Sequence, residues 1–503
     1  MRFKQVYLLY GINKLMNMEK YQITILGLGP GESRLLTQEA WQELEKVTEV
    51  YLRTNRHPAV AGFPAHLQVH SFDDIYQKAG DFSYVYQTIV DKVIELGKRS
   101  QGVHYAVPGH PFVAEATTPL IINRAQQEGM SVRVIEGISF LEPLFTALKL
   151  DPLPGLTITD ALELAATHYP LFPPHYPAII AQLYSRQVAA DVKLTLMEVY
   201  PAEHKVSLVH YAGTKQQSIE NCYLYEIDHS SQIDWMSSLY LPALDKPASF
   251  EAFQEVIAHL RAPEGCPWDR EQTHASLRPH LLEETYELLD ALDKGDTNSI
   301  KEELGDLLLQ VLMHAQIANE EGEFDLTDVL RTVHHKIVSR HPHVFGNLNV
   351  SGSGEVLRNW EAIKATERVN NGKADKGLLD SIPRYLPALN QAEQYQQRAA
   401  RVGFDWKDLD GVLQKVNEEL VELSQVTDDQ SKMEEFGDLL FSLVNVARWF
   451  GIDAESALRT ANERFANRFR YMEREARKRG KSLNQMTMEE LDALWEEAKS
   501  DNH

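Results

Sequence analysis

The acidic residues of one short stretch are the first candidates for chemistry in this sequence. The stretch "HLLEETYELLDAL" (residues 280–292) places Glu283, Glu284 and Glu287 close together on a predicted helix. Like charges at helical spacing repel one another, and each such pair costs about a few tenths of a kcal/mol. A divalent cation bound between the carboxylates would remove this cost. The alternative interpretation is a solvated acidic face, which is the common fate of a glutamate-rich helix.

The acidic pattern occurs twice, as E-E-x-x-E followed by E-x-x-D. In the first copy, Glu303 and Asp306 supply the second part. Residues three or four apart share a helix face, so two antiparallel helices would bring these carboxylates together. Carboxylate oxygens favour Mg²⁺, Mn²⁺ or Ca²⁺, whereas di-iron bundles use a histidine that is missing from this pattern. The second copy consists of Glu418, Glu419, Glu422, Glu435 and Asp438.

A basic helix is predicted after each set of acids. Arg464 and Arg468 lie four residues apart in the second copy, and Lys336 and Arg340 occupy the matching positions in the first. Arginine binds phosphate through two parallel hydrogen bonds. Carboxylate-bound Mg²⁺ facing basic side chains is suited to a polyphosphate substrate. The alternative is again a solvated helix face, or ion pairs with neighbouring glutamates.

Both copies also place a glycine inside a predicted helix. Gly305 and Gly437 directly precede the aspartate of each pattern. Glycine in a helix interior costs ~1 kcal/mol relative to alanine. A close crossing of two helices would explain its presence, and we therefore expect a close crossing at both positions.

The acids and the basic helices belong to an internal repeat in the C-terminal half of the chain. Four blocks recur in the same order, beginning with "LLEETYELLDAL" (281–292) and "VNEELVELSQV" (416–426) and ending with "WEAIK" (360–364) and "WEEAK" (495–499). A repeat of this length indicates two structural units of the same kind. The polar stretch 368–383 is the predicted linker between them.

The N-terminal half has a different pattern of hydrophobic residues. Apolar runs such as "QITILGLG", "GVHYAVPG" and "VRVIEG" read as strands, and they alternate with stretches of helical periodicity. This alternation is typical of an α/β domain. From residue 248 onward the strand signals vanish, so we place the boundary within residues 230–250. Residues 1–19 precede the first strand and are treated as an N-terminal extension.

Length and composition limit the classes of protein to consider. A chain of 503 residues suggests about three domains. Its net charge of −23 argues against a general binder of nucleic acid or anionic membranes. Two cysteines exclude a disulfide framework and favour a reducing compartment. Because neither a signal peptide nor a membrane-spanning run of about 18 apolar residues is evident, we expect a cytoplasmic protein.

The repeated half resembles the MazG family of nucleoside triphosphate pyrophosphohydrolases, in tandem. The opening blocks are "LRAPEGCPWDREQTHASLRPHLLEETYELLDAL" (260–292) and "VGFDWKDLDGVLQKVNEELVEL" (402–423). The resemblance implies an all-α fold, usually dimeric, that cleaves nucleoside triphosphates between the α- and β-phosphates. It also implies a requirement for Mg²⁺, with Mn²⁺ as an alternative, and release of nucleoside monophosphate and pyrophosphate.

Site residues are carried over from this resemblance position by position. Glu418 and Glu283 would orient the attacking water or act as further ligands. Trp495 could stack on the base, although core packing is the alternative role for a single tryptophan. The implied metal ligands are Glu419, Glu422, Glu435 and Asp438, with Glu284, Glu287, Glu303 and Asp306 in the first copy. The implied nucleotide contacts are Lys415, Arg464, Arg468 and Trp495, with Lys336, Arg340 and Trp360 in the first copy.

The N-terminal half resembles the tetrapyrrole methylases, a class of S-adenosylmethionine-dependent methyltransferases. The matching stretches are "ILGLGPGESRLLTQEAWQEL" (25–44), "YAVPGHPFVAEAT" (105–117), "VIEGISFLEPLFTAL" (134–148) and "LVHYAGT" (208–214). A dinucleotide-binding Rossmann site fits less well, because the glycines are spaced GxGxG. The resemblance implies a cofactor cleft lined by Gly29, Pro30, Gly31, Pro108, Gly109, His110, Pro111, Gly137, Ile138, Ser139, Tyr184 and Ala212.

Two positions depart from the methylase pattern. Glu32 stands where the family commonly has aspartate, and His110 replaces the aspartate of a G-D-P motif. These changes leave methyl transfer and its acceptor open, and His110 is either a substrate contact or a tolerated substitution. The order of the two halves resembles the bacterial YabN-type fusion.

We therefore predict an α/β methylase-like domain followed by two all-α MazG-like helical bundle domains. The expected bounds are 20–230, 248–368 and 383–503. The expected function is Mg²⁺-dependent hydrolysis of nucleoside triphosphates by a homodimer that binds neither nucleic acid nor membranes. Two alternatives stay open: a non-catalytic nucleotide sensor or scaffold, and a methyltransferase whose helical half serves dimerisation.

Overall fold

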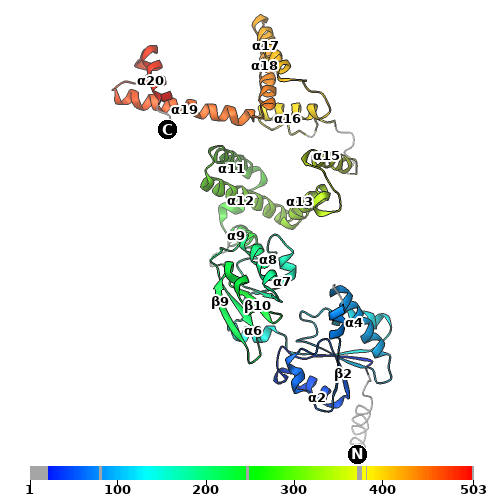
Figure 1. Cartoon of the computed structure of the whole chain (residues 1–503). Helices are drawn as coiled ribbons and strands as arrows, with labels where there is room; N and C mark the ends of the chain where they lie inside the picture. The colour runs from blue at the N-terminus through cyan, green and yellow to red at the C-terminus, as the bar shows by residue number, and fades with distance from the viewer. Residues whose placement is uncertain (1–20, 79–81, 245–248, 371–376, 381, 501–503) are drawn as a thin grey trace, which may run out of the picture. The chain divides into compact units, whose positions relative to one another are not determined.

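The computed structural model describes the chain except residues 1–20, 79–81, 245–248, 371–376, 381 and 501–503. The predicted N-terminal extension and part of the predicted linker 368–383 therefore lie outside the described residues. The chain divides into two compact units, Met1–Val256 and Ile257–His503 (Figure 1). No helix in the described part of the chain is both long and apolar enough to cross a membrane.

A parallel five-stranded sheet forms the first half of the first unit. Its strand order is β3-β2-β4-β1-β5, so β1 is an inner strand between β4 and β5, and every residue of β1 is buried. Continuous apolar runs of this kind are typical of parallel strands covered by helices on both faces. The strands are β1 (Ile23–Gly27), β2 (Glu49–Leu52), β3 (Gln68–Ser71), β4 (Val103–Val107) and β5 (Val132–Ile135). The helical elements are η1 (Ser33–Leu35), α2 (Gln38–Lys46), η2 (Pro58–Gly62), α3 (Asp73–Lys78), α4 (Phe82–Gly97) and α5 (Thr117–Gln127).

A second five-stranded sheet completes this unit. Its order is β6-β7-β10-β8-β9, in which only β6 and β7 pair in parallel. The middle strand β10 lies after residue 230, inside the stretch where the sequence places the boundary. The strands are β6 (Thr157–Asp160), β7 (Ala178–Ala181), β8 (Lys205–His210), β9 (Ser218–Tyr223) and β10 (Ser237–Leu241). The helical elements are α6 (Leu141–Leu148), α7 (Ala161–Ala165), α8 (Arg186–Met197) and η3 (Leu224–His229).

The second unit is helical in its described residues. The fold class predicted from sequence, an α/β domain followed by all-α domains, is therefore confirmed. The first copy of the repeat contains α9 (Phe250–Arg261), α10 (Pro267–Glu271), α11 (His274–Lys294), α12 (Thr297–Glu321), α13 (Leu326–Arg340), α14 (Pro342–Phe345) and α15 (Ser353–Asn370). The second copy contains α16 (Ala388–Arg401), α17 (Leu409–Gln425), α18 (Asp429–Trp449), α19 (Ala454–Lys478), η4 (Leu483–Gln485) and α20 (Met488–Ser500).

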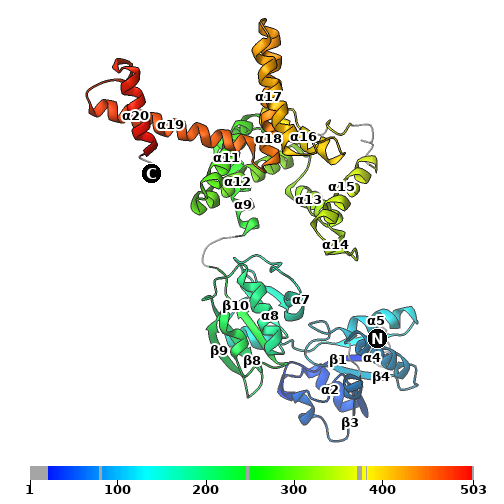
Figure 2. The ribbon, with the colours of Figure 1, turned by 45° about the horizontal axis from the view of Figure 1, so that its top comes forward.

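A helical hairpin is the element that both copies share. Helices α11 and α12 pack side by side, and so do helices α17 and α18 (Figure 2). Aspartate caps the second helix each time: Asp296 accepts a hydrogen bond from the start of α12, and Asp428 accepts one from the start of α18. Such caps stabilise a helix by ~1 kcal/mol. The short turn and its cap therefore fix which residues of the two helices face each other.

The prediction of a close helix crossing at Gly305 and Gly437 is wrong for the single chain. A Cβ added at either glycine would meet no atom within 4 Å. Packing inside the described chain therefore does not require glycine at these positions, and both helices have open space beside them.

Candidate functional site

The first acidic cluster forms where α11 faces α12. Carboxylate oxygens of Glu284, Glu303 and Asp306 lie within 4.8 Å of one another. Burial raises the pKa of Glu284, and the negative charges of Asp306, Glu287 and Glu303 raise it further. The pKa of Glu303 is raised by burial and then by Glu287 and Asp306. The four predicted ligands of this copy therefore interact, and three of them share one small volume.

One oxygen of this cluster lacks a partner. The Oε2 atom of Glu303 is buried and accepts no hydrogen bond from the described residues. A buried polar atom without a partner is unfavourable, because it has lost its hydrogen bonds to water. A cation between the carboxylates would supply the missing interaction. The donor set, made only of carboxylate oxygens, fits a hard divalent cation such as Mg²⁺.

The second acidic cluster forms at the same place in the α17–α18 hairpin. Carboxylate oxygens of Glu419, Glu422 and Glu435 lie within 4.8 Å of one another, and Glu419 is 4% exposed. Burial raises the pKa of Glu435, followed by the charges of Glu422, Glu419 and Asp438. Asp438 therefore acts on the cluster electrostatically, as Glu287 does in the first copy.

The two clusters differ in the cation beside them. In the second copy, the Nζ atom of Lys415 lies 2.8 Å from Glu418 and 2.8 Å from Glu419, and these contacts raise the pKa of Lys415. In the first copy, His280 takes this position and lies 3.6 Å from Glu283. The second cluster therefore contains a permanent positive charge, whereas the first has a histidine.

The predicted basic and aromatic positions meet in the same way in both copies. The guanidinium of Arg340 lies 5.7 Å from the ring centre of Trp360, and that of Arg468 lies 5.5 Å from the ring centre of Trp495. Trp495 also packs on Phe465, with ring centres 5.3 Å apart. Both tryptophans are half-buried. Core packing therefore accounts for part of the surface of Trp495.

Within one chain, α19 approaches α11, because Arg459 pairs with Asp293 at 2.9 Å, but among the described residues the predicted basic contacts do not pair with the acidic clusters. In the part of the chain that the structure describes, no ion pair joins either acidic cluster to the predicted contacts of α13 or α19. Arg340 instead donates hydrogen bonds to both carboxylate oxygens of Glu367, the shortest of 2.6 Å. The residues concerned are Lys336, Arg340, Arg464 and Arg468.

A second candidate site lies at the carboxyl edge of the parallel sheet, where three glycine-containing loops meet. The amide of Gly29 donates to the carbonyl of Gly109 over 3.2 Å, and the reverse bond is 2.8 Å. A Cβ on Gly137 would lie 2.3 Å from the Gly109 oxygen, and one on Gly27 would lie 2.5 Å from the Gly137 nitrogen. These loops approach backbone to backbone, which leaves no room for side chains between them.

Loops of the second sheet reach the same edge. A Cβ on Gly31 would lie 2.8 Å from the oxygen of Gly213, which follows the predicted residue Ala212. Gln182 and Tyr211 have φ angles of 60° and 51°, which non-glycine residues rarely adopt, and they precede Tyr184 and Ala212. Strained backbone of this kind clusters at functional sites.

The remaining predicted cofactor contacts lie along these same loops. Ser139 is buried, accepts a hydrogen bond from the Leu141 amide and donates one to Glu142. The Nδ1 atom of His110 accepts a hydrogen bond from the Phe112 amide at 3.1 Å. The other predicted positions are buried at Pro30 and Pro111 and half-buried at Pro108 and Ile138.

Three residues of this edge were missed in the sequence. His57 is buried and hydrogen-bonded to the backbone of Gly29, and burial lowers its pKa to about 4. Arg53 forms a buried ion pair with Glu115, which lies in the loop after β4. Arg53 could have been predicted from its position in the sequence, because it directly follows β2 and the sites of α/β proteins lie at the carboxyl ends of strands.

Comparison with known proteins identifies both halves. The family model of tetrapyrrole (corrin/porphyrin) methylases matches residues 22–228, and that of the MazG nucleotide pyrophosphohydrolase domain matches residues 272–345. The uncharacterized protein YabN of Bacillus subtilis is 42% identical over 487 residues, which cover 95% of this chain and 98% of that protein.

Other relatives match the helical half alone. The nucleoside triphosphate pyrophosphohydrolase/pyrophosphatase MazG of Thermotoga maritima is 48% identical over 250 residues, which cover 50% of this chain and 95% of that protein. The nucleoside triphosphate pyrophosphohydrolase of Escherichia coli K12 is also 48% identical over 250 residues, which cover 48% of this chain and 94% of that protein. The chain therefore belongs to the YabN-type family, in which a tetrapyrrole methylase domain is fused to a MazG nucleotide pyrophosphohydrolase region.

Proposed function

We propose that the helical half hydrolyses nucleoside triphosphates to nucleoside monophosphates and pyrophosphate, with Mg²⁺ as cofactor and Mn²⁺ as an alternative. The observation that carries this proposal is the convergence of three carboxylates within 4.8 Å in each helical hairpin. The names of the relatives from Thermotoga maritima and Escherichia coli support the same reaction. Because these substrates are intracellular metabolites, the proposal places the protein in the cytoplasm.

The residues of the second cluster suggest a division of roles. Glu419, Glu422, Glu435 and Asp438 would hold the cation, which when bound offsets phosphate charge and lowers the pKa of water. Glu418 stays beside the cluster through its ion pair with Lys415. There it can accept a hydrogen bond from the attacking water and take up its proton. Hydrolysis then breaks the anhydride bond between the α- and β-phosphates and consumes one water.

The first cluster has the same set of carboxylates and supports the same chemistry. Glu284, Glu287, Glu303 and Asp306 would hold the cation, with Glu283 in the position of Glu418. The unpartnered oxygen of Glu303 supports a cation there. Turnover is therefore proposed for both copies.

We further infer that the active form is a homodimer in which a second copy supplies the basic helix. Within one chain, Arg464 and Arg468 form no ion pair with the acids in the described residues. The acidic hairpins also expose apolar side chains that a second copy could cover, and glycine leaves open space on α12 and α18. The exposed residues include Leu282, Tyr286, Leu304, Leu420, Val421, Phe436, Leu440 and Phe441.

For the α/β half we propose binding of S-adenosylmethionine at the loops after β1, β4, β5, β7 and β8. The backbone-to-backbone contacts of Gly27, Gly109 and Gly137 support this, because they hold three loops together at the carboxyl edge of the sheet, where ligands of α/β proteins bind. Calorimetry with S-adenosylhomocysteine should detect binding to the wild type and none to Gly137→Ala. Gly352→Ala is the control, because Gly352 lies outside this half, is not among the glycines with positive φ, and a Cβ there meets no atom within 4 Å. Equal binding by all three proteins would contradict this assignment.

The experiment that tests the main proposal is release of pyrophosphate from mixed nucleoside triphosphates. Wild type should turn over with Mg²⁺ and stop with EDTA. Asp438→Asn should lose most of the turnover if the second copy dominates, and Asp306→Asn should lose most if the first does. Wild type without turnover would contradict the proposal and favour the nucleotide sensor.

A further inference from the structure

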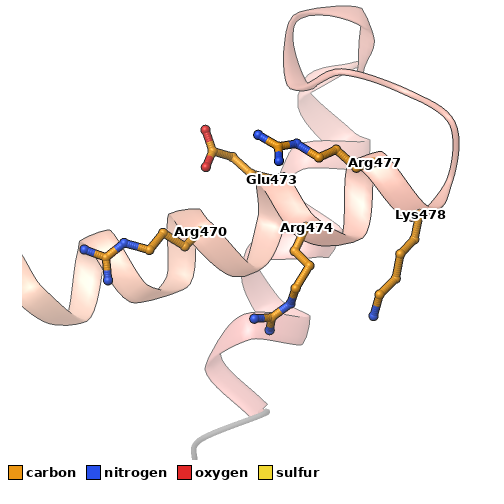
Figure 3. Close-up of a pocket in the computed structure, with 5 residues that line it drawn as sticks. All are labelled: Arg470, Glu473, Arg474, Arg477 and Lys478. Atoms are coloured by element: carbon orange, nitrogen blue, oxygen red, sulfur yellow. The ribbon is translucent and has the colours of Figure 1, made fainter.

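A basic face on α19 is left unused by the proposed reaction. Arg470, Glu473, Arg474, Arg477 and Lys478 line an open depression of about 490 Å³ (Figure 3). The matching helix of the first copy, α13, ends at Arg340, the counterpart of Arg468. The basic face therefore lies in an extension of α19 that the first copy does not share.

This face is distinct from the proposed nucleotide contacts. Its residues follow one another at three- and four-residue steps, which places them on one side of the helix. The other side carries Met472 and Ala476, which are buried against Leu494 of α20. Arg468 lies on that other side, over the ring of Trp495. Packing against α20 therefore turns the basic face toward solvent.

The positive charges of this face are poorly compensated. Arg470 donates a hydrogen bond of 2.7 Å to the neutral amide of Asn467, and the Arg474 guanidinium lies 5.4 Å from the Tyr471 ring centre. Within the described residues, Lys478 is the member of the face that pairs with a carboxylate, at 2.7 Å from Glu475. Like charges at this spacing destabilise a helix.

The helix dipole explains only part of the pattern. Cations are favourable in the last turn of a helix, where carbonyl groups point outward. Arg477 and Lys478 lie in the last turn of α19, but Arg470 and Arg474 precede it. The four cations together outnumber the carboxylates of Glu473 and Glu475 beside them, so this face is suited to a compact anion that carries several charges.

We propose that this basic face binds inorganic oligophosphate, with pyrophosphate as the physiological ligand. Arginine can contact two phosphate oxygens at once, so Arg470, Arg474 and Arg477 offer enough donors for both phosphates. Binding here requires no divalent cation, unlike the acidic clusters. The proposed function enters only as the source of pyrophosphate, which is the product of the proposed hydrolysis.

The test is calorimetric titration of the full chain with inorganic pyrophosphate in EDTA at low ionic strength. The double variant Arg470→Gln/Arg474→Gln should bind at least about 10-fold more weakly than wild type. The control Arg479→Gln/Lys481→Gln removes two charges from the same end of the molecule, where they pair with Glu497 and Glu490. It should bind within about twofold of wild type, as should Glu419→Gln/Glu422→Gln.

The possible outcomes separate this proposal from the proposed hydrolysis. Initial rates of nucleotide hydrolysis should be unchanged in Arg470→Gln/Arg474→Gln, because the basic face takes no part in the reaction. The binding measurement adds pyrophosphate directly, so it tests this proposal even if the protein does not hydrolyse nucleotides. Equal weakening in both basic double variants would overturn the proposal, because the binding would then be diffuse electrostatics. Tighter binding of a short single-stranded oligonucleotide than of pyrophosphate would also overturn it. So would the absence of any heat of binding in wild type.

Discussion

At the scale of single residues, the difference between Lys415 and His280 sets the charge of the two clusters. Lys415 lies 2.8 Å from Glu419 and so offsets part of the repulsion among its neighbours. In the first cluster, burial and four neighbouring acids raise the pKa of Glu284. A raised pKa means that the ionised form is less favourable in the folded state. Without a divalent cation, the first cluster should therefore destabilise the fold more than the second.

We expect Glu284→Gln to stabilise the metal-free protein, because it removes one of several like charges. The rise in Tm should be on the order of 1 °C. Glu419→Gln should not raise Tm, because Lys415 then loses a partner. Scanning calorimetry in EDTA measures both, with the exposed Glu264→Gln as control. Added Mg²⁺ should raise the Tm of wild type and of the control more than that of either cluster variant. Equal stabilisation by Mg²⁺ in all four proteins would contradict the proposed ligands.

At the scale of elements, the loops of the parallel sheet depend on a neutral histidine. Burial lowers the pKa of His57 to about 4, below its value of about 6.5 in an unfolded chain. The unfolded state then binds the proton more readily than the folded state. The resulting stability is fully present above pH 6.5 and is lost as the pH falls toward 4.

We therefore expect the α/β half of the wild-type protein to lose Tm between pH 6.5 and 4. His57→Asn should have a lower Tm at pH 7, because two backbone hydrogen bonds change, but a shallower fall over this range. His66→Asn, at an exposed position, serves as control and should keep the slope of wild type. The half-buried His104 and the buried His210, whose pKa values burial also lowers, contribute the same slope to all three proteins. An identical slope in His57→Asn would show that its protonation is unimportant.

The elements also show what could be predicted from sequence and what could not. Helical spacing alone placed Glu303 and Asp306 on one face, and the repeat indicated that a second helix brings further acids to them. His57, Arg53 and Glu115 escaped prediction because each acts through a contact with a residue far away in the chain. The prediction of a close crossing at Gly305 and Gly437 failed because helix propensity gives the energetic cost of a glycine but not the reason for its presence. The position of β10 between β7 and β8 depends on pairing across long loops, which local pattern does not reveal.

At the scale of the whole molecule, Arg464 and Arg468 form no ion pair with the acidic clusters within the described chain, although Arg459 of the same helix pairs with Asp293 of α11. A homodimer would resolve this if α19 of one copy approaches a hairpin of the other. The exposed apolar residues of these hairpins are numerous enough to form such an interface. Association of the two copies and completion of the active site would then be a single event.

This arrangement predicts complementation between two inactive variants. One carries Glu287→Ala and Glu422→Ala, and the other carries Lys336→Ala, Arg340→Ala, Arg464→Ala and Arg468→Ala, so that each removes the same element from both copies; each alone should be inactive while remaining folded. Coexpression should restore a part of the activity, because mixed dimers contain sites with intact acids and intact arginines. Light scattering should show a dimer at assay concentration. A monomer with full activity would contradict the arrangement, as would failed complementation by verified mixed dimers.

The contact between the Gly27 and Gly137 loops has a genetic consequence. Backbone fills the space beside both residues, so every replacement introduces atoms where none fit. Any missense change in either codon should therefore be harmful, whatever amino acid results, although the two codons are far apart in the gene. A second change elsewhere cannot easily compensate, because the obstacle is main chain rather than a side chain that could be exchanged. Variation in this gene is thus expected to spare both codons together.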